Sequence, residues 1–159
     1  MRQGPHDEQR QRWTEGLIRE LGETIVGALG DDDVVEVLLN PDGRIWLDSR
    51  TEGMYDSGSR LLPQEAEAIL ASIAGMLGTQ IDSEHPIIEA ELPLDGSRIE
   101  GMVPPLVASP SFAIRKRATR VFPLSHYIET GSMTLLQAEL LRSAIAERRN
   151  ILISGGTGS

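Results

Sequence analysis

Five residues at the end of the chain have a composition that suits the binding of phosphate groups. Gly155, Gly156, Thr157, Gly158 and Ser159 directly follow the apolar run 150–154. Glycines let backbone N–H groups converge on phosphate oxygens, and the pattern G-x-x-x-x-G-K-[ST] places such a loop after a buried strand. Here Gly155 takes the first glycine position, and the lysine would follow Ser159. The alternative is a flexible tail, but the apolar run favours a nucleotide-binding loop.

A group of cations could also bind phosphate. Arg115, Lys116, Arg117 and Arg120 lie close together, and residues 101–127 contain no Asp or Glu, although acids outnumber bases 24 to 15 in the chain. Alternation along a strand would place Arg115 and Arg117 on one face and Lys116 on the other. One interpretation is an exposed edge strand protected by charge. The other is an edge that faces a polyanion, such as the phosphates of a nucleotide.

Arg98 is the single base among six acids between Asp82 and Glu100. By its charge alone, a local salt bridge would be expected. Glu89 and Glu91 share one face of the predicted strand that precedes it, and we interpret them as a solvated face. The histidines are isolated from one another, so the sequence predicts no metal site.

Composition restricts the classes of function. The formal net charge is -9, which opposes direct binding of nucleic acid by this domain. The absence of cysteine excludes disulfides, thiolate zinc sites and cysteine nucleophiles. The polar start of the chain and the lack of a long apolar run predict a cytoplasmic protein, with a peripheral place on a membrane assembly left open.

Periodicity predicts the elements that must position these residues. Helices are expected over 8–29, 63–77 and 134–149, the last opened by a capping box at Thr134. Strands are expected over 34–39 and 44–48 as a hairpin, near 53–55, and over 87–93, 97–102, 111–117 and 150–154. Residues 56–59 are expected to form a loop.

The pattern changes character along the chain. Antiparallel hairpins with helices predict an α+β domain over residues 1–120, followed by a linker over 121–133. Residues 134–159 then predict the first helix and strand of an α/β P-loop domain.

Four segments carry a resemblance to a known family. They are Glu36–Trp46, Glu84–Arg98, Pro110–Arg117 and Asn150–Ser159. Together they resemble the TrbB-like conjugal-transfer ATPases of the type II and type IV secretion ATPase superfamily, from about Asp31 to the last residue.

The resemblance implies a subunit of a homo-hexamer. Its N-terminal domain would be a curved antiparallel sheet with flanking helices, and its second domain would be RecA-like, with ATP and Mg²⁺ between them. Arg115 and Arg98 would be the catalytic, phosphate-sensing arginines, and Arg117 a further nucleotide contact. Such motors act at the cytosolic face of the inner membrane with other type IV secretion components, in DNA transfer or pilus assembly.

The P-loop lysine lies outside the sequence, so we expect this chain alone to be inactive as an ATPase. Two alternatives stay open. One is a non-catalytic module for assembly or interaction, and the other is a pilus or type II secretion ATPase of the same superfamily.

Overall fold

The computed structural model describes the backbone of residues 5–117 and 122–156, and side chains within these ranges from residue 11 onward. The chain divides into two compact units, Met1–Arg117 and Ala118–Ser159, and each unit is described by itself. The domain and linker limits expected from the sequence stay a prediction. Among the described residues, no helix combines the length and the apolar character needed to cross a membrane.

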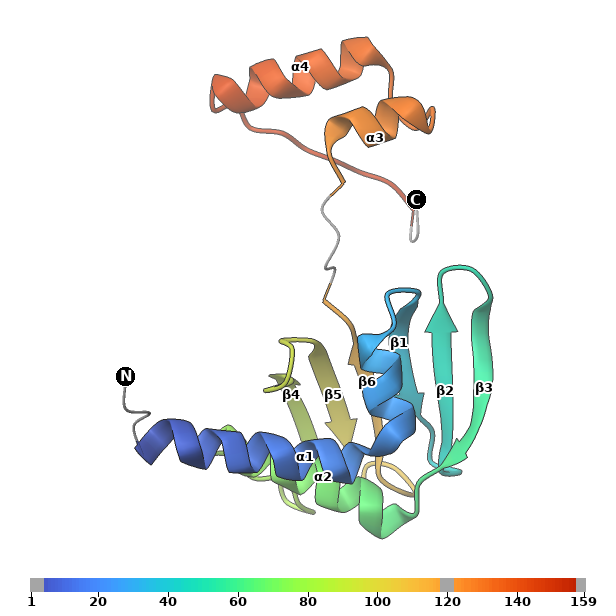
Figure 1. The fold of residues 1–159 in the computed structure, drawn as a ribbon, viewed down its shortest axis with the longest axis vertical. Coiled ribbons are helices and arrows are strands. Elements are labelled where there is room, and N and C mark those ends of the chain that lie inside the picture. Colours follow the sequence, from blue (N-terminus) through green and yellow to red (C-terminus); the bar gives the residue numbers. More distant parts are fainter. Residues whose placement is uncertain (1–4, 118–121, 157–159) are drawn as a thin grey trace. The chain divides into compact units, whose positions relative to one another are not determined.

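The first unit is built on one sheet of six antiparallel strands. The strand order is β3-β2-β1-β6-β5-β4 (Figure 1). The bounds are β1 Val34–Leu39, β2 Arg44–Ser49, β3 Gly53–Arg60, β4 Ile87–Glu91, β5 Arg98–Met102 and β6 Ser111–Arg115. The predicted α+β class is confirmed, and so is the predicted hairpin of β1 and β2.

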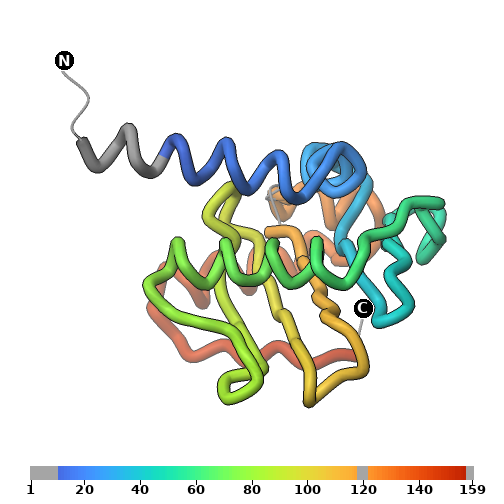
Figure 2. Tube along the Cα trace, turned by 90° about the horizontal axis from the view of Figure 1, so that it is seen from below, coloured from blue at the N-terminus to red at the C-terminus, as the bar shows by residue number. Residues whose placement is uncertain are grey.

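The core lies on one face of this sheet, under α1 (Pro5–Gly30) and α2 (Pro63–Met76). Figure 2 shows the two helices side by side. The fully apolar cluster includes, from the strands, Val37, Leu39, Ile45, Ile88, Ile99 and Ile114, and, from the helices, Leu17, Leu21, Ile25, Ile69, Leu70 and Ile73. Because successive side chains on a strand point to opposite faces, the residues between these apolar positions lie on the other face, which we call the open face.

A break inside α1 separates two helical segments. Gly22 has φ 74° and ψ 171°, which is outside the helical region. This backbone conformation is accessible to glycine at little cost. The sequence predicted one uninterrupted helix over 8–29, which is wrong at this residue. The break could not be seen in the sequence, because the helical spacing of apolar residues continues on both sides of it. Leu17 and Leu21 before it and Ile25 after it are all buried.

β3 is longer than the sequence predicted. It continues through Asp56–Ser59, which was expected to be a loop. These residues are small and polar and one face of the strand is exposed, so they carry no apolar alternation that would have marked a strand. Ser57 Oγ donates a hydrogen bond of 2.8 Å to the carbonyl of Ile45 and ties the edge strand to β2.

The second unit contains two helices, α3 (Leu124–Glu129) and α4 (Leu135–Ala146). Thr134 caps α4 in a capping box with Gln137, as the sequence predicted. The short helix α3 lies within the segment predicted to be a linker without regular structure. It lacks a buried residue, so there was no apolar stripe from which to predict it.

The predicted strand over Asn150–Ser154 is absent. These residues have no regular structure and form no ladder with any described residue. Leu152 is 94% exposed and Ile153 is 85% exposed. An apolar run becomes a buried strand only when neighbouring strands pair with its backbone, and the described part of this unit supplies none.

Candidate anion-binding site on the open face of the sheet

Arg98 and Arg115 are direct cross-strand neighbours. β5 begins at Arg98, β6 ends at Arg115, and the antiparallel register pairs the two residues. Opposite residues on one face have Cβ atoms roughly 4.5–5.5 Å apart. The family resemblance named both arginines, and the fold brings them together.

The core fixes the face on which both arginines lie. Ile99 and Ile114, their neighbours along the chain, are 2% and 0% exposed and face the helices. Alternation therefore directs Arg98 and Arg115 to the open face, where both are exposed. A register slip of one residue in either strand would bury the guanidinium group of that strand, so this orientation is strongly specified.

The same register places a carboxylate on each side of the arginine pair. Glu36 of β1 pairs with Arg115, and Glu91 of β4 pairs with Arg98. Four charged residues therefore cross four strands in the order Glu36, Arg115, Arg98, Glu91. We call this set the charged row.

The charged row lines a hollow of about 520 Å³, together with Glu89 and Glu100. Within residues 11–117 and 122–156, neither arginine of the row forms an ion pair or a side-chain hydrogen bond. Both guanidinium groups can therefore donate to an anion. Their planar forks match two oxygens of a phosphate group at once.

The position of β6 corrects the expected electrostatics. β6 lies between β1 and β5 in the interior of the sheet, so the edge position that both interpretations assumed is wrong. That this strand faces a polyanion stays a prediction. Residues 101–127 contain no acid, but four carboxylates line the same hollow as Arg115, and three of them, Glu36, Glu89 and Glu91, come from other strands. The sequence could not show this, since Glu36 reaches Arg115 through a long-range pairing.

Glu91 carried a local signal that the sequence analysis did not use. The turn at residues 93–95 closes the hairpin of β4 and β5, and its short length places Glu91 opposite Arg98. Glu89 and Glu91 are exposed, as we expected of a solvated face. We did not expect the hollow that both residues line with the arginines.

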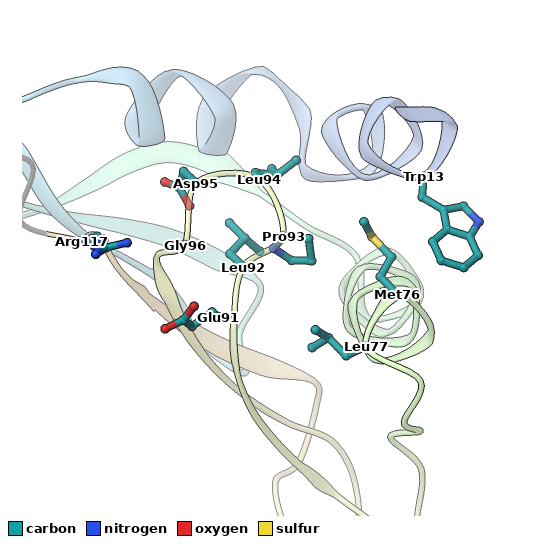
Figure 3. A pocket seen from close by; sticks show the side chains of 10 residues that line it. All are labelled: Trp13, Met76, Leu77, Glu91, Leu92, Pro93, Leu94, Asp95, Gly96 and Arg117. Atoms are coloured by element: carbon teal, nitrogen blue, oxygen red, sulfur yellow. The ribbon is translucent and has the colours of Figure 1, made fainter. Parts of the chain in front are cut away.

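Arg117 lies beside the turn that joins β4 to β5. Its Nη1 atom would be 3.8 Å from a Cβ atom at Gly96. Figure 3 shows it at one end of a second hollow, of about 720 Å³, with Trp13 and Met76 at the other end. Asp95 in this turn already accepts two hydrogen bonds from Ser97, from the backbone N at 2.9 Å and from Oγ at 2.7 Å. Arg117 therefore lines a different hollow from Arg115, although alternation predicted one face for both.

Lys116 has a structural role. Its ammonium group donates to the carbonyl of Ala28 at 3.1 Å and to the carbonyl of Asp31. The C-terminal end of a helix favours a cation because its last carbonyls lack partners. Lys116 therefore ties β6 to the end of α1, on the opposite side from Arg115.

Known proteins share part of this sequence and its fold. No family model matches the chain. The chain is 47% identical over 139 residues to the conjugal transfer protein TrbB of Rhizobium radiobacter, and 46% identical over 143 residues to a probable conjugal transfer protein TrbB of Sinorhizobium fredii. Over these residues the chain is similar to the two TrbB proteins.

The TrbB-like chain spans less than half the length of these relatives. The matches cover 87% and 90% of it, but 43% and 44% of the two relatives. Among solved structures, the VirB11 ATPase of the Brucella suis type IV secretion system, in complex with sulphate, superposes with a TM-score of 0.66 at 22% identity. That match covers 89% of this chain and 45% of the other. It shows that the fold is shared.

The glycine-rich loop of the TrbB-like chain is described only in part. Gly155 and Gly156 are exposed and have no regular structure. Thr157, Gly158 and Ser159 lie outside the described residues, as does Arg120. The glycines belong to the second unit and the charged row to the first, so the role of residues 155–159 in binding nucleotide stays a prediction.

Two carboxylates outside the hollows have a pKa below the usual value for Asp. The pKa of Asp33 is held below its usual value chiefly by the hydroxyl groups of Ser49 and Thr51, which donate at 2.6 and 2.7 Å. Backbone N–H groups of His85 and Glu84 lower the pKa of Asp82. Both carboxylates fix turns, so their perturbation is a feature of the scaffold.

Proposed function

We propose that the chain is part of an ATP-hydrolysing subunit of a conjugative type IV secretion system, and that Arg98 and Arg115 bind the phosphates of its nucleotide. The observation that carries this proposal is the pairing of these two exposed arginines on the open face, without an ion pair to either among the described residues. The names of the relatives support the assignment to conjugal transfer.

The donor chemistry of the site fits phosphate. Two guanidinium groups on rigid neighbouring strands bind and orient phosphate oxygens. Fixed cations stabilise the negative charge that develops on a phosphoryl group as it is transferred, and they need no rearrangement to do so. Arg117 would add a further cation beside the turn of β4 and β5.

ATP bound with Mg²⁺ supplies the phosphoryl group and additional positive charge for this chemistry. The described residues contain no group of three or more His, Asp or Glu side chains that could hold a metal ion. We therefore assign Mg²⁺ to no residue of the described part. We place the start of the phosphate-binding loop at residues 155–159, where the glycine pattern predicts it.

The wider assembly belongs to the same proposal. The subunit would form a homo-hexamer on the cytoplasmic side of the inner membrane and act with other components of the secretion system. The likeness of fold to a type IV secretion ATPase supports this arrangement. Analytical ultracentrifugation of the intact subunit tests it, and a monomer at all concentrations and with ATP present would contradict it.

Steady-state ATP hydrolysis by the intact subunit that contains this chain tests the role of Arg115. We expect Arg115→Ala to lower kcat by about 100-fold or more, because removal of one fixed donor to the transition state costs that much. Arg115→Lys keeps the charge but loses the planar fork, so it should recover only part of the rate. Arg19→Ala is the control, since Arg19 is also exposed but lies on α1, away from the open face. Hydrolysis by Arg115→Ala at the wild-type rate would remove Arg115 from the site.

One observation favours a second candidate function. The hollow contains four carboxylates and two guanidinium groups, which disfavours a free anion and would suit a basic segment of a partner protein. In that case the chain would be a non-catalytic assembly module. An intact subunit that forms rings but neither binds nor hydrolyses ATP would support this alternative.

A further inference from the structure

The arginine pair of the charged row creates a local electrostatic problem. Like charges directly opposite each other on antiparallel strands destabilise a sheet. Arg98 and Arg115 are such a pair, in the interior of the sheet where strands lie on both sides. Some other feature of the molecule must offset their repulsion when no anion is bound.

Glu36 and Glu91, the outer members of the charged row, lie where their negative charges can offset this repulsion. Glu91 lies on the edge strand β4, so Arg98 is its one cross-strand neighbour among the described residues. Glu36 pairs with Arg115 on one side and with Asp48 of β2 on the other. Opposite charges in such positions contribute roughly 0.2–1 kcal/mol each. The order of charges within the charged row is therefore negative, positive, positive, negative, and Asp48 adds a second negative charge beside Glu36.

We propose that Glu36 and Glu91 are positioning residues for the arginine pair. Their charges offset the repulsion between the two guanidinium groups in the anion-free protein. The same charges oppose the entry of an anion into the hollow, so they weaken its binding.

This opposition has a consequence for the ligand. A single small phosphate faces two guanidinium groups and the nearby carboxylates of Glu89 and Glu100 in addition to Glu36 and Glu91. These four carboxylates weaken the attraction of the two guanidinium groups for such an ion. A ligand that binds well must gain further contacts outside the hollow, as a nucleotide polyphosphate does. This part of the inference rests on the proposed function.

Neutralising substitutions in the full 159-residue chain test the positioning role without any ligand. Glu91→Gln removes a charge opposite Arg98, so we expect its Tm to fall by about 1–4 °C. Glu89→Gln is the matched control, because Glu89 lies on the same strand and the same face but pairs with Glu100. Its Tm should stay constant or rise, since a like-charge pair is removed. Equal Tm values for wild type and Glu91→Gln, or an equal loss in Glu89→Gln, would overturn the inference.

Isothermal titration calorimetry at low ionic strength measures the affinity for inorganic pyrophosphate. A merely structural role of the carboxylates would not change this affinity. Glu91→Gln and Glu36→Gln should bind pyrophosphate about threefold to tenfold more tightly than wild type, because one nearby repulsive charge is gone. Glu89→Gln should show a smaller gain. If all three variants bound pyrophosphate with the same affinity as one another, the positioning role would be overturned.

The two tests separate this inference from the proposed function. If neither wild type nor any variant binds pyrophosphate, the phosphate-binding role of Arg98 and Arg115 fails. The difference in Tm between Glu91→Gln and Glu89→Gln then decides the positioning role by itself.

Discussion

Leu70 of α2 lies directly against Gly101 of β5. A Cβ atom at Gly101 would be 2.3 Å from Leu70 Cδ2 and 3.0 Å from Ile88 Cγ2. Leu70 is fully buried, so a shift of its side chain away from an added methyl group would disturb its neighbours in the core. The absence of a side chain at Gly101 therefore sets how closely α2 approaches the sheet strand that begins with Arg98.

Gly101→Ala should destabilise the first unit by about 1–3 kcal/mol, because an added methyl group overpacks a buried site. Urea unfolding followed by far-UV circular dichroism measures the change. Gly27→Ala is the control, since Gly27 lies in α1 with no atom within 4 Å of an added Cβ. The control should be neutral or more stable by up to about 1 kcal/mol. Equal stability of the two variants would contradict the close packing of α2 on β5.

Gly22→Ala tests the break in α1. An alanine at a φ of 74° costs about 1–2 kcal/mol, because its Cβ atom crowds the backbone. We expect a corresponding loss in the free energy of unfolding. Gly16→Ala, in the helical segment before the break, should cause no loss. A gain of stability and of helical signal in Gly22→Ala would show that α1 is continuous in solution.

Lys116→Met tests the tie between β6 and the end of α1. The variant loses two hydrogen bonds to backbone carbonyls at a helix C-terminus but keeps a similar aliphatic chain. A loss of about 1–2 kcal/mol in the free energy of unfolding is expected. Arg117→Met removes a cation one residue further along and should cost much less. Thermal unfolding of both variants in the same buffer gives the comparison, and equal losses would assign the effect to net charge.

The hydrogen bonds to Asp33 predict a dependence of stability on pH. Its folded-state pKa lies below the ordinary value of 3.8, so its stabilising contribution is complete above 3.8 and is lost as pH falls through the lower folded value. Ser49→Ala removes the largest cause of this shift. The pKa of Asp33 should then rise toward 3.8, and acid unfolding should begin at a higher pH. Titration of the side-chain carboxyl signals by NMR measures this, and the pKa of Asp82 serves as an internal control. An unchanged pKa of Asp33 would contradict the bond to Ser49.

Local patterns in the sequence were sufficient for most elements of the fold. The β1–β2 hairpin, the start of α2 at Pro63 and the capping box at Thr134 follow from turn chemistry, propensity and periodicity within short windows. The failures have local causes as well. The break at Gly22 interrupts a continuous apolar spacing, and the polar part of β3 has no apolar alternation. The run at 150–154 depends on strands that the described residues do not contain.

The sequence by itself determined which side chains alternate between the two faces of each strand, and therefore that Arg98 and Arg115 would be exposed once their neighbours were buried. Only the tertiary structure decided that these two arginines face each other, that β6 lies inside the sheet, and that Glu36 stands beside Arg115. The physical reason is that periodicity records the environment of a residue along its own strand. Strand order and register depend on long loops closing and on apolar faces matching across the whole sheet.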